Sequence, residues 1–193
     1  TTTALIAHIL RSAGRDVQMG GNIGVNVLDL APPARNRFHV IEMSSFQIDL
    51  TPGLAPTIGV LLNLSPDHLD RHGTMASYAG VKTALIAGAE WAVVGDDDAW
   101  CRAVSAERSA AGKPTLRIAA KGEADVFYSG GKLFERTGTG SGPVASLAGI
   151  GTLRGEHNGQ NAAAAFAVAE RLGLPVETIA AMLPRIDEEL TVD

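Results

Sequence analysis

Acidic, hydroxyl and amide side chains follow an apolar run directly in residues 38–47, whose sequence is FHVIEMSSFQ. A short continuous apolar run is typical of a buried parallel strand. Open α/β sheets bind their ligands just beyond the carboxyl ends of such strands. Glu42 stands at that edge and is followed by two serines and Gln47. Its carboxylate is therefore either a ligand of a metal or nucleotide, or a group paired with a neighbouring loop.

A second apolar run, residues 57–64, leads into the polar sequence SPDHLDRHG at residues 65–73. His68 lies there between Asp67 and Asp70, just past a predicted buried strand. Imidazole and carboxylate groups both bind divalent ions. The setting makes His68 a better metal-ligand candidate than an isolated histidine would be.

Two further segments have both a structural and a functional interpretation. The sequence GGNIG at residues 20–24 is either a turn between a strand and a helix, or backbone that approaches a ligand closely, since glycine has no side chain to block it. Lys82 lies among apolar residues in a predicted helix, residues 75–87. Without further information, it is interpreted as a surface lysine whose aliphatic stem covers the helix.

Helix capping explains two other polar runs. Three aspartates at residues 96–98 precede a predicted helix at residues 99–110, and capping is their favoured interpretation. Farther along, Asn158 can cap a helix at residues 162–172, and Asn161 lies close to the same helix start. Either amide could instead recognise the edge of a base, because a carboxamide offers a donor and an acceptor together.

Strand-type and helix-type segments alternate along the chain, which predicts a doubly wound α/β fold around a mostly parallel sheet. Glycine-rich alternating pieces at residues 120–151 predict a small antiparallel region without catalytic residues. The pattern also predicts a first helix at residues 2–13, a short helix at residues 25–30 and a last helix at residues 175–182. An acidic tail follows at residues 183–193.

Composition limits the class of protein. With 193 residues, 46% of them hydrophobic, the chain can form one sizeable core. A net charge of −5 argues against nucleic acid as the main partner, although a small phosphorylated ligand stays open. The single cysteine, Cys101, excludes an internal disulfide, and no apolar run approaches the ~20 residues that span a bilayer. Because the chain begins at Thr1 without a Met or a basic leader, we expect it to be a fragment.

Three motifs at strand ends, GGNIG, EMSSFQ at residues 42–47 and DHLDR at residues 67–71, together resemble the central ATP-binding domain of the Mur ligases. These are ATP-dependent amino-acid-adding enzymes of peptidoglycan synthesis. The first two motifs are most similar to those of the members that add D-glutamate. The resemblance covers residues 1–182, leaves residues 183–193 unassigned, and implies a P-loop NTPase-like domain. The family's phosphate loop, which ends in Gly-Lys-Ser/Thr, is expected upstream of Thr1 because it is absent from this sequence.

The resemblance also implies residue roles at a site for ATP and Mg²⁺. It assigns Glu42, His68 and Lys82 as catalytic residues and Mg²⁺ ligands, Asn158, Asn161 and Thr1 to the nucleotide, and Asn22 and Ser45 to the substrate. Lys82 would be carbamylated. Burial among apolar residues makes this reasonable, because it disfavours the ammonium form and leaves a nucleophilic amine.

The implied reaction has two stages. The carboxylate of UDP-N-acetylmuramoyl-L-alanine attacks the γ-phosphate of ATP, and the amine of D-glutamate then displaces phosphate from the acyl phosphate. Divalent ions reduce the repulsion between the anionic reactants. We expect a cytoplasmic, monomeric enzyme, inactive as this fragment alone. The alternatives are another Mur ligase, a folylpolyglutamate-synthase-like ligase, or a non-catalytic nucleotide-binding module.

Overall fold

A computed structural model describes residues 1–138 and 140–187. Its main sheet has the strand order β3-β4-β5-β6-β7-β8. The first four of these strands are parallel and the last two are added antiparallel. Their bounds are β3 Ile58–Leu61, β4 Trp91–Gly95, β5 Thr115–Ala119, β6 Val126–Ser129, β7 Lys132–Thr137 and β8 Gly140–Ser146. The predicted mostly parallel α/β fold with a small antiparallel region is confirmed.

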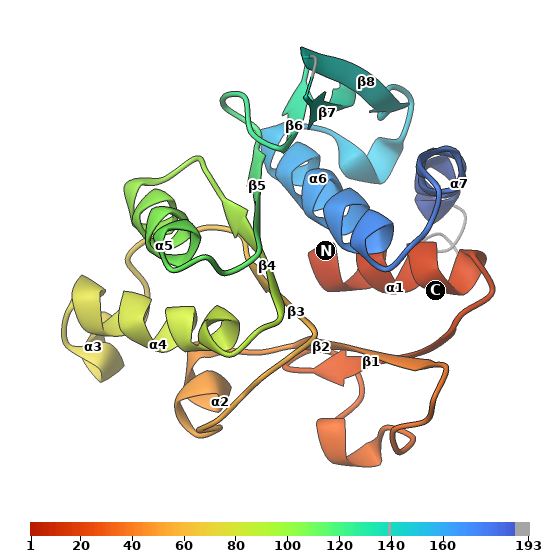
Figure 1. Ribbon diagram of the computed structural model, residues 1–193. Coiled ribbons are helices and arrows are strands. Elements are labelled where there is room, and N and C mark those ends of the chain that lie inside the picture. The colour runs from red at the N-terminus through yellow and green to blue at the C-terminus, as the bar shows by residue number, and fades with distance from the viewer. Residues whose placement is uncertain (139, 188–193) are drawn as a thin grey trace.

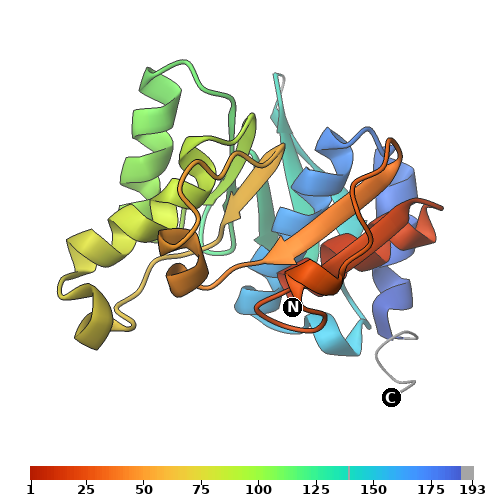
Figure 2. The same ribbon diagram turned by 90° about the horizontal axis from the view of Figure 1, so that it is seen from below.

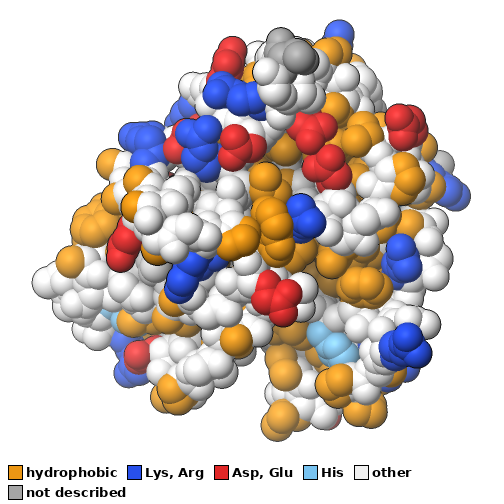
Figure 3. Space-filling model, in the orientation of Figure 1, with side chains coloured by type: hydrophobic (Ala, Val, Ile, Leu, Met, Phe, Trp, Pro, Cys, Tyr) orange, Lys and Arg blue, Asp and Glu red, His pale blue; other side chains and the backbone are white. Residues whose placement is uncertain are grey.

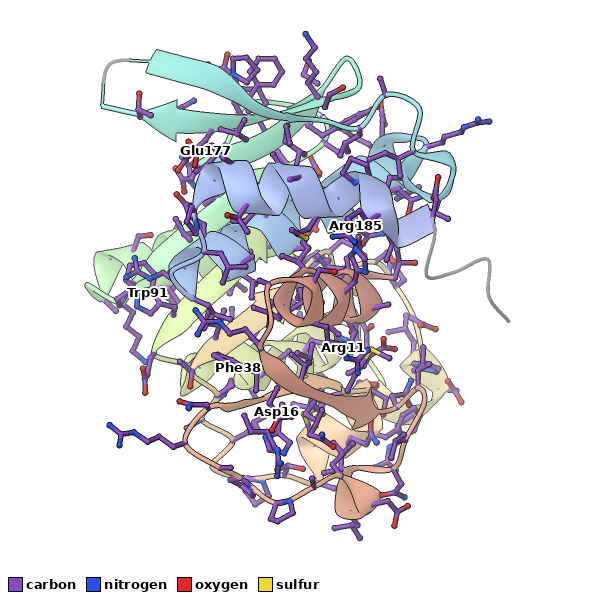
Figure 4. The ribbon with its side chains drawn as sticks, turned by 90° about the vertical axis from the view of Figure 1, so that its right-hand side faces the viewer. Arg11, Asp16, Phe38, Trp91, Glu177 and Arg185 are labelled. Carbon is purple, nitrogen blue, oxygen red and sulfur yellow. The ribbon has the colours of Figure 1, made fainter. Side chains whose placement is uncertain are left out.

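A separate parallel pair, β1 (Asp16–Gly21) and β2 (Arg37–Glu42), carries the first two sequence motifs at its carboxyl end. Seen from below, this pair runs alongside α1, and α2 follows directly from the end of β2 (Figure 2). Figure 4 shows α1 between this pair, on which Asp16 and Phe38 are labelled, and the layer formed by α6 and α7. The glycine-rich motif and Glu42 are therefore next to each other at one sheet edge.

Helices cover both faces of the main sheet, with α4 and α5 on one side and α1, α6 and α7 on the other (Figure 1). The helices are α1 Thr2–Ser12, α2 Ser45–Asp49, α3 Leu69–His72, α4 Met75–Ala87, α5 Ala99–Ala110, α6 Glu156–Arg171 and α7 Val176–Met182. Single 3₁₀ turns occur at Val27–Asp29, Gly151–Leu153 and Leu183–Arg185. The helices predicted at residues 2–13, 75–87, 99–110 and 175–182 are confirmed within a residue at each end.

The larger of two main cores surrounds α6, whose alanines at residues 162–165, 167 and 169 are fully buried. Small side chains let this helix lie close to its neighbours. Gly159, in its first turn, lies against the ring of Tyr128, and a Cβ there would come within 2.3 Å of that ring. The other main core, between α4, α5 and the opposite face, includes Leu61, Ile86 and Val94.

One predicted helix and the predicted start of another are wrong. Residues 25–30 contain only the 3₁₀ turn, because the Val25 carbonyl accepts from Gly21 N and the Asn26 side chain accepts from Leu28 N. Helix α6 begins at Glu156 rather than at residue 162, and its N-cap is Gly155 at φ 87°, a conformation that favours glycine. Asn158 is thus inside the helix and does not cap it.

The beginning of the acidic tail packs on the domain. Leu183 is fully buried and Ile186 is 2% exposed. The Asp187 carboxylate accepts hydrogen bonds from the backbone N–H groups of Gly151 and Thr152 and from the Thr152 hydroxyl. Residues 188–193 of the predicted tail lie outside the described residues.

Candidate active site

The first side of the site is the carboxyl end of the β1–β2 pair. Glu42 ends β2, and its Oε2 accepts a hydrogen bond of 3.2 Å from the Thr3 hydroxyl. The Glu42 carbonyl accepts from Asn22 N at 2.7 Å. Gly21 has φ 113°, and a Cβ at this position would lie 2.2 Å from the Glu42 carbonyl oxygen. Close approach of the two motifs therefore requires glycine at residue 21.

Lys82, on α4, shares an electrostatic neighbourhood with carboxylates from two other elements. Burial lowers the pKa of Lys82 below its ordinary value, and the negative charges of Glu42 and Asp67 act against that shift. Carboxylates at the end of β2 and in the loop after β3 thus act on the amine that α4 carries. Partial desolvation favours the neutral amine, which is the nucleophilic form.

His68 has a strained backbone. It is the N-cap of α3 with φ 50° and ψ 34°, and among the non-glycine residues that the structure describes it alone has a positive φ. A left-handed conformation costs an ordinary residue about 1–2 kcal/mol. Asp67 stabilises it by accepting from His68 N at 2.9 Å, and the Phe46 ring meets the imidazole edge-on with centroids 5.2 Å apart. Strain of this kind is a reason to suspect a functional role.

Ser45 and His72 join the helices that follow the two strand ends. Ser45 is 4% exposed, and its hydroxyl shares a hydrogen bond of 3.0 Å with Nε2 of His72. Ser44 caps α2, with Gln47 closing a capping box. The Arg71 guanidinium lies over the Phe46 ring at 5.2 Å.

The N-termini of α1 and α6 meet through amide and hydroxyl groups. The Thr2 hydroxyl donates to Asn161 Oδ1 at 2.6 Å, and Asn161 Nδ2 donates to Asn158 Oδ1 at 3.2 Å. Asn158 Nδ2 donates to the Arg154 carbonyl at 3.0 Å. Thr1 is the exposed N-cap of α1 and makes no side-chain capping bond. Asn158 and Asn161 are therefore neighbours on one helix turn, close to the start of α1.

One residue that the sequence prediction missed connects this region to the main sheet. Gln160 Nε2 donates to Asp97 Oδ2 at 2.9 Å, and Asn63 Nδ2 donates to Gln160 Oε1 at 3.4 Å. Asp98 caps α5 as predicted, through Cys101 N, but Asp97 binds the backbone N–H groups of residues 120 and 121 instead. The sequence offered no signal for it, because Gln160 is one of three amide side chains, with Asn158 and Asn161, just before the alanine run.

The donor types at the site fit Mg²⁺, which prefers oxygen ligands. Glu42 supplies a carboxylate, and a carbamate on Lys82 would supply two more oxygens. No cluster of three or more His, Cys, Asp or Glu side chains with metal-binding geometry occurs among residues 1–138 and 140–187. His68, whose side chain is 48% exposed, is drawn toward Asp67, with 3.4 Å between Nε2 and Oδ2.

The described part of the chain has two hollows at its surface. One of about 500 Å³ separates residues 48–55 from α4, and another of about 440 Å³ lies between residues 120–130 and Glu156. Neither is lined by Glu42, His68 or Lys82. Figure 3 shows a notch at the lower edge of the molecule, between the lobe of α2 and α3 and the lobe of β1 and β2. No helix in the described part of the chain is long and apolar enough to cross a membrane.

The family model and two curated relatives that match this chain are all Mur ligases. The family described as "Mur ligase middle domain" matches residues 1–169. A UDP-N-acetylmuramoylalanine--D-glutamate ligase of Chelativorans sp. is 54% identical over 176 residues, which are 90% of this chain and 38% of that protein. The ligase of the same name from Brucella abortus is 50% identical over 185 residues, covering 95% of this chain and 40% of that protein. The chain therefore spans well under half the length of these relatives.

Solved structures share the fold. MurF from Acinetobacter baumannii aligns with a TM-score of 0.66 at 20% identity, over 95% of this chain and 43% of that one. MurF ligase from Thermotoga maritima, solved in complex with ADP, aligns with a TM-score of 0.61 at 19% identity, over 93% of this chain and 45% of that one. At these identities the likeness concerns the fold alone.

Proposed function

The chain belongs to the Mur ligase family, of which it contains the middle domain, and from this premise we propose that the whole protein is an ATP-dependent ligase. It adds D-glutamate to UDP-N-acetylmuramoyl-L-alanine, the activity in the name of relatives 50–54% identical to this chain. The observation that carries the proposal is that two carboxylates from other elements, Glu42 and Asp67, act electrostatically on the partly desolvated amine of Lys82.

The chemical difficulty is that a substrate carboxylate must reach the γ-phosphate of ATP, which is also anionic. Bound Mg²⁺ would supply positive charge between the two groups and stabilise the charge that develops during phosphoryl transfer. Glu42 and His68 are the residues that would hold it. The resulting acyl phosphate then reacts with the D-glutamate amine, which releases phosphate and forms the amide.

Lys82 would contribute as a carbamate. Its neutral amine attacks the carbon of CO₂, loses a proton and becomes an N-carboxylate, so that a cation is replaced by an anion. Burial supports this step because it lowers the pKa of Lys82. The carboxylate so formed would be a further oxygen ligand for Mg²⁺.

We propose that Asn158 and Asn161 contact adenine and that Thr1 lies at the nucleotide, because all three are at the adjoining N-termini of α1 and α6. Helix N-termini favour anionic ligands such as phosphates. Asn22 is exposed beside Glu42 and would bind the muramoyl-alanine substrate. A contact of Ser45 with this substrate stays a prediction; its hydroxyl lies 3.0 Å from Nε2 of His72.

The test is an assay of phosphate release by the full-length protein with ATP, Mg²⁺ and UDP-N-acetylmuramoyl-L-alanine, offering D-glutamate, D-alanine, L-lysine or L-glutamate. Turnover with D-glutamate alone is expected. Preference for another amino acid would favour a sister ligase, and activity on a folate would favour a folylpolyglutamate-synthase-like enzyme. Nucleotide binding without turnover would favour the non-catalytic module. We also propose a monomer in the cytoplasm.

A further inference from the structure

We propose that His72 is a positioning residue, which fixes His68 relative to Glu42 through its hydrogen bond with Ser45. The inference rests on the proposed function, because it assumes that Glu42 and His68 hold Mg²⁺ together. Ser45 comes three residues after Glu42, and His72 comes four residues after His68. The bond between them therefore ties the segment following one strand end to the segment following the other.

The contact is partly buried, with Ser45 on its buried side and His72 half-buried. Ser45 is 4% exposed, and its hydroxyl lies 3.0 Å from His72 Nε2. Two aromatic rings also contact the His72 imidazole. The ring centroid of Tyr78 lies 5.4 Å and that of Phe46 5.8 Å from the imidazole centroid. Contacts with two rings and with a buried hydroxyl restrain the orientation of this half-buried histidine. It is suited to holding other groups in place rather than to reacting.

The position of His72 is transmitted to His68 through the single turn of α3. His72 N donates to the His68 carbonyl at 3.0 Å, and Arg71 N donates to the same carbonyl at 3.1 Å. His68 itself has the left-handed backbone conformation that an ordinary residue adopts only when its surroundings impose it. Anchoring His72 therefore stabilises the left-handed backbone conformation of His68, which sets the direction of its imidazole.

Phe46 adds a second connection between the same two helices. Its ring meets the His68 ring at 5.2 Å and 70°, and Arg71 lies over the ring while also pairing with Asp49 of α2 at 3.3 Å. Residues of α2 thus contact His68, Arg71 and His72 of the α3 segment in turn. Ser45 is the buried residue of this set, so the loss of its hydrogen bond should loosen the whole contact.

The experiment compares four variants of the full-length protein: Ser45→Ala, His72→Phe, the double variant, and His72→Gln. His72→Phe keeps the ring and removes the hydrogen bond, whereas the amide of His72→Gln can restore a polar contact with Ser45. Ser109→Ala is the matched control, because Ser109 is exposed at the far end of α5. Circular dichroism establishes folding, and the smaller change Ser45→Ala carries the test if His72→Phe does not fold.

Two measurements report the effect. Electron paramagnetic resonance titration with Mn²⁺, in the presence of a non-hydrolysable ATP analogue, measures metal affinity without turnover. The Mg²⁺ concentration that gives half the maximal rate of the ligase reaction measures metal affinity in the working enzyme. Each single variant should bind the metal ion about 10-fold more weakly or worse, because losing a group that orients a metal ligand lowers metal affinity by such factors. The double variant should bind the metal ion no more weakly than the single variant with the lower affinity. His72→Gln should recover most of the wild-type affinity.

Wild-type metal affinity in folded Ser45→Ala and His72→Phe would overturn the inference, and so would additive losses in the double variant. A raised KM for UDP-N-acetylmuramoyl-L-alanine in Ser45→Ala but not in His72→Phe would make Ser45 a direct substrate contact and overturn it as well. A wild-type protein that ligates no D-glutamate would refute the proposed function instead. The Mn²⁺ titration would still test the role of His72 in that case.

Discussion

Gln160 of α6 and Asp97, which follows β4, are joined by a hydrogen bond of 2.9 Å between Nε2 and Oδ2. The same carboxylate accepts from the N–H groups of Ala120 and Lys121 at the end of β5, and the side-chain oxygen Oε1 of Gln160 accepts from Asn63 Nδ2 after β3. One 5%-exposed amide therefore connects the ends of three parallel strands to the helix that carries Asn161.

Replacing Gln160 tests this connection. In Gln160→Met both hydrogen bonds are lost, and losing the one to the charged Asp97 carboxylate should lower the free energy of unfolding by about 1–3 kcal/mol. Gln160→Glu keeps the acceptor for Asn63 but sets a second carboxylate against Asp97, so it should raise the KM for ATP further than Gln160→Met does. Urea unfolding and steady-state kinetics of the full-length protein measure the two effects. Equal kinetics in both variants would mean that Asp97 does not hold Gln160.

Gly159→Ala is expected to destabilise the protein despite the better helix propensity of alanine. The added Cβ would come within 2.3 Å of the Tyr128 ring, and overpacking of a core costs about 1–3 kcal/mol. Alanine in place of a helical glycine gains only about 1 kcal/mol. The thermal unfolding midpoint should therefore fall, and Tyr128→Leu should restore part of the loss. Gly122→Ala is the control, since a Cβ at Gly122 meets nothing within 4 Å. A midpoint unchanged by Gly159→Ala would show that the ring moves freely.

The order of elements was predictable because apolar runs and helical periodicity are local properties. Residues 38–41 and 91–95 are buried or half-buried strand residues apart from exposed His39, and Met75–Ala87 is a helix with the expected bounds. The positions of Glu42 and of the glycine-rich motif at strand ends were also predicted, and the parallel pairing of β1 with β2 brings the two together. These parts depend on rules that operate over a few residues.

The contacts between distant segments were not predictable in the same way. The hydrogen bond between Ser45 and His72 was not predicted, because it depends on the packing of α3 on α2. Asn158 has the composition of a helix cap, yet Gly155 starts the helix three residues earlier because glycine adopts φ 87° easily. In both cases the outcome depends on a neighbour whose position the local pattern does not specify.

Lys82→Ala should abolish ligation by the full-length protein, because it removes the group proposed to become a carbamate. A small exogenous carboxylate should restore part of the activity by occupying the space of the lost side chain. Urea unfolding should change little or show a slight gain, since burial already disfavours the charged lysine. Full activity in the variant without any added carboxylate would remove Lys82 from the mechanism. Lys113→Ala, at an exposed lysine after α5, is the control.

Asp187 should make the stability of the protein depend on acid pH. Hydrogen bonds from the Thr152 hydroxyl and from the backbone N–H groups of Thr152 and Gly151 hold the pKa of Asp187 below its ordinary value of 3.8. The unfolded chain lacks these bonds and takes up a proton at the ordinary pKa. Below that value the unfolded state therefore binds more protons than the folded state, and stability falls as the pH falls.

The contribution of Asp187 is thus fully present above about pH 4 and is lost as the pH falls through the folded-state pKa. Asp187→Asn should be less stable than the wild type at pH 7, and the difference should shrink as the pH is lowered through 4 toward 2. Urea midpoints at a series of pH values measure it, with Glu107→Gln on the exposed face of α5 as the control. A difference that stays constant with pH would mean that Asp187 stabilises the η2 turn, Gly151–Leu153, by packing rather than through its charge.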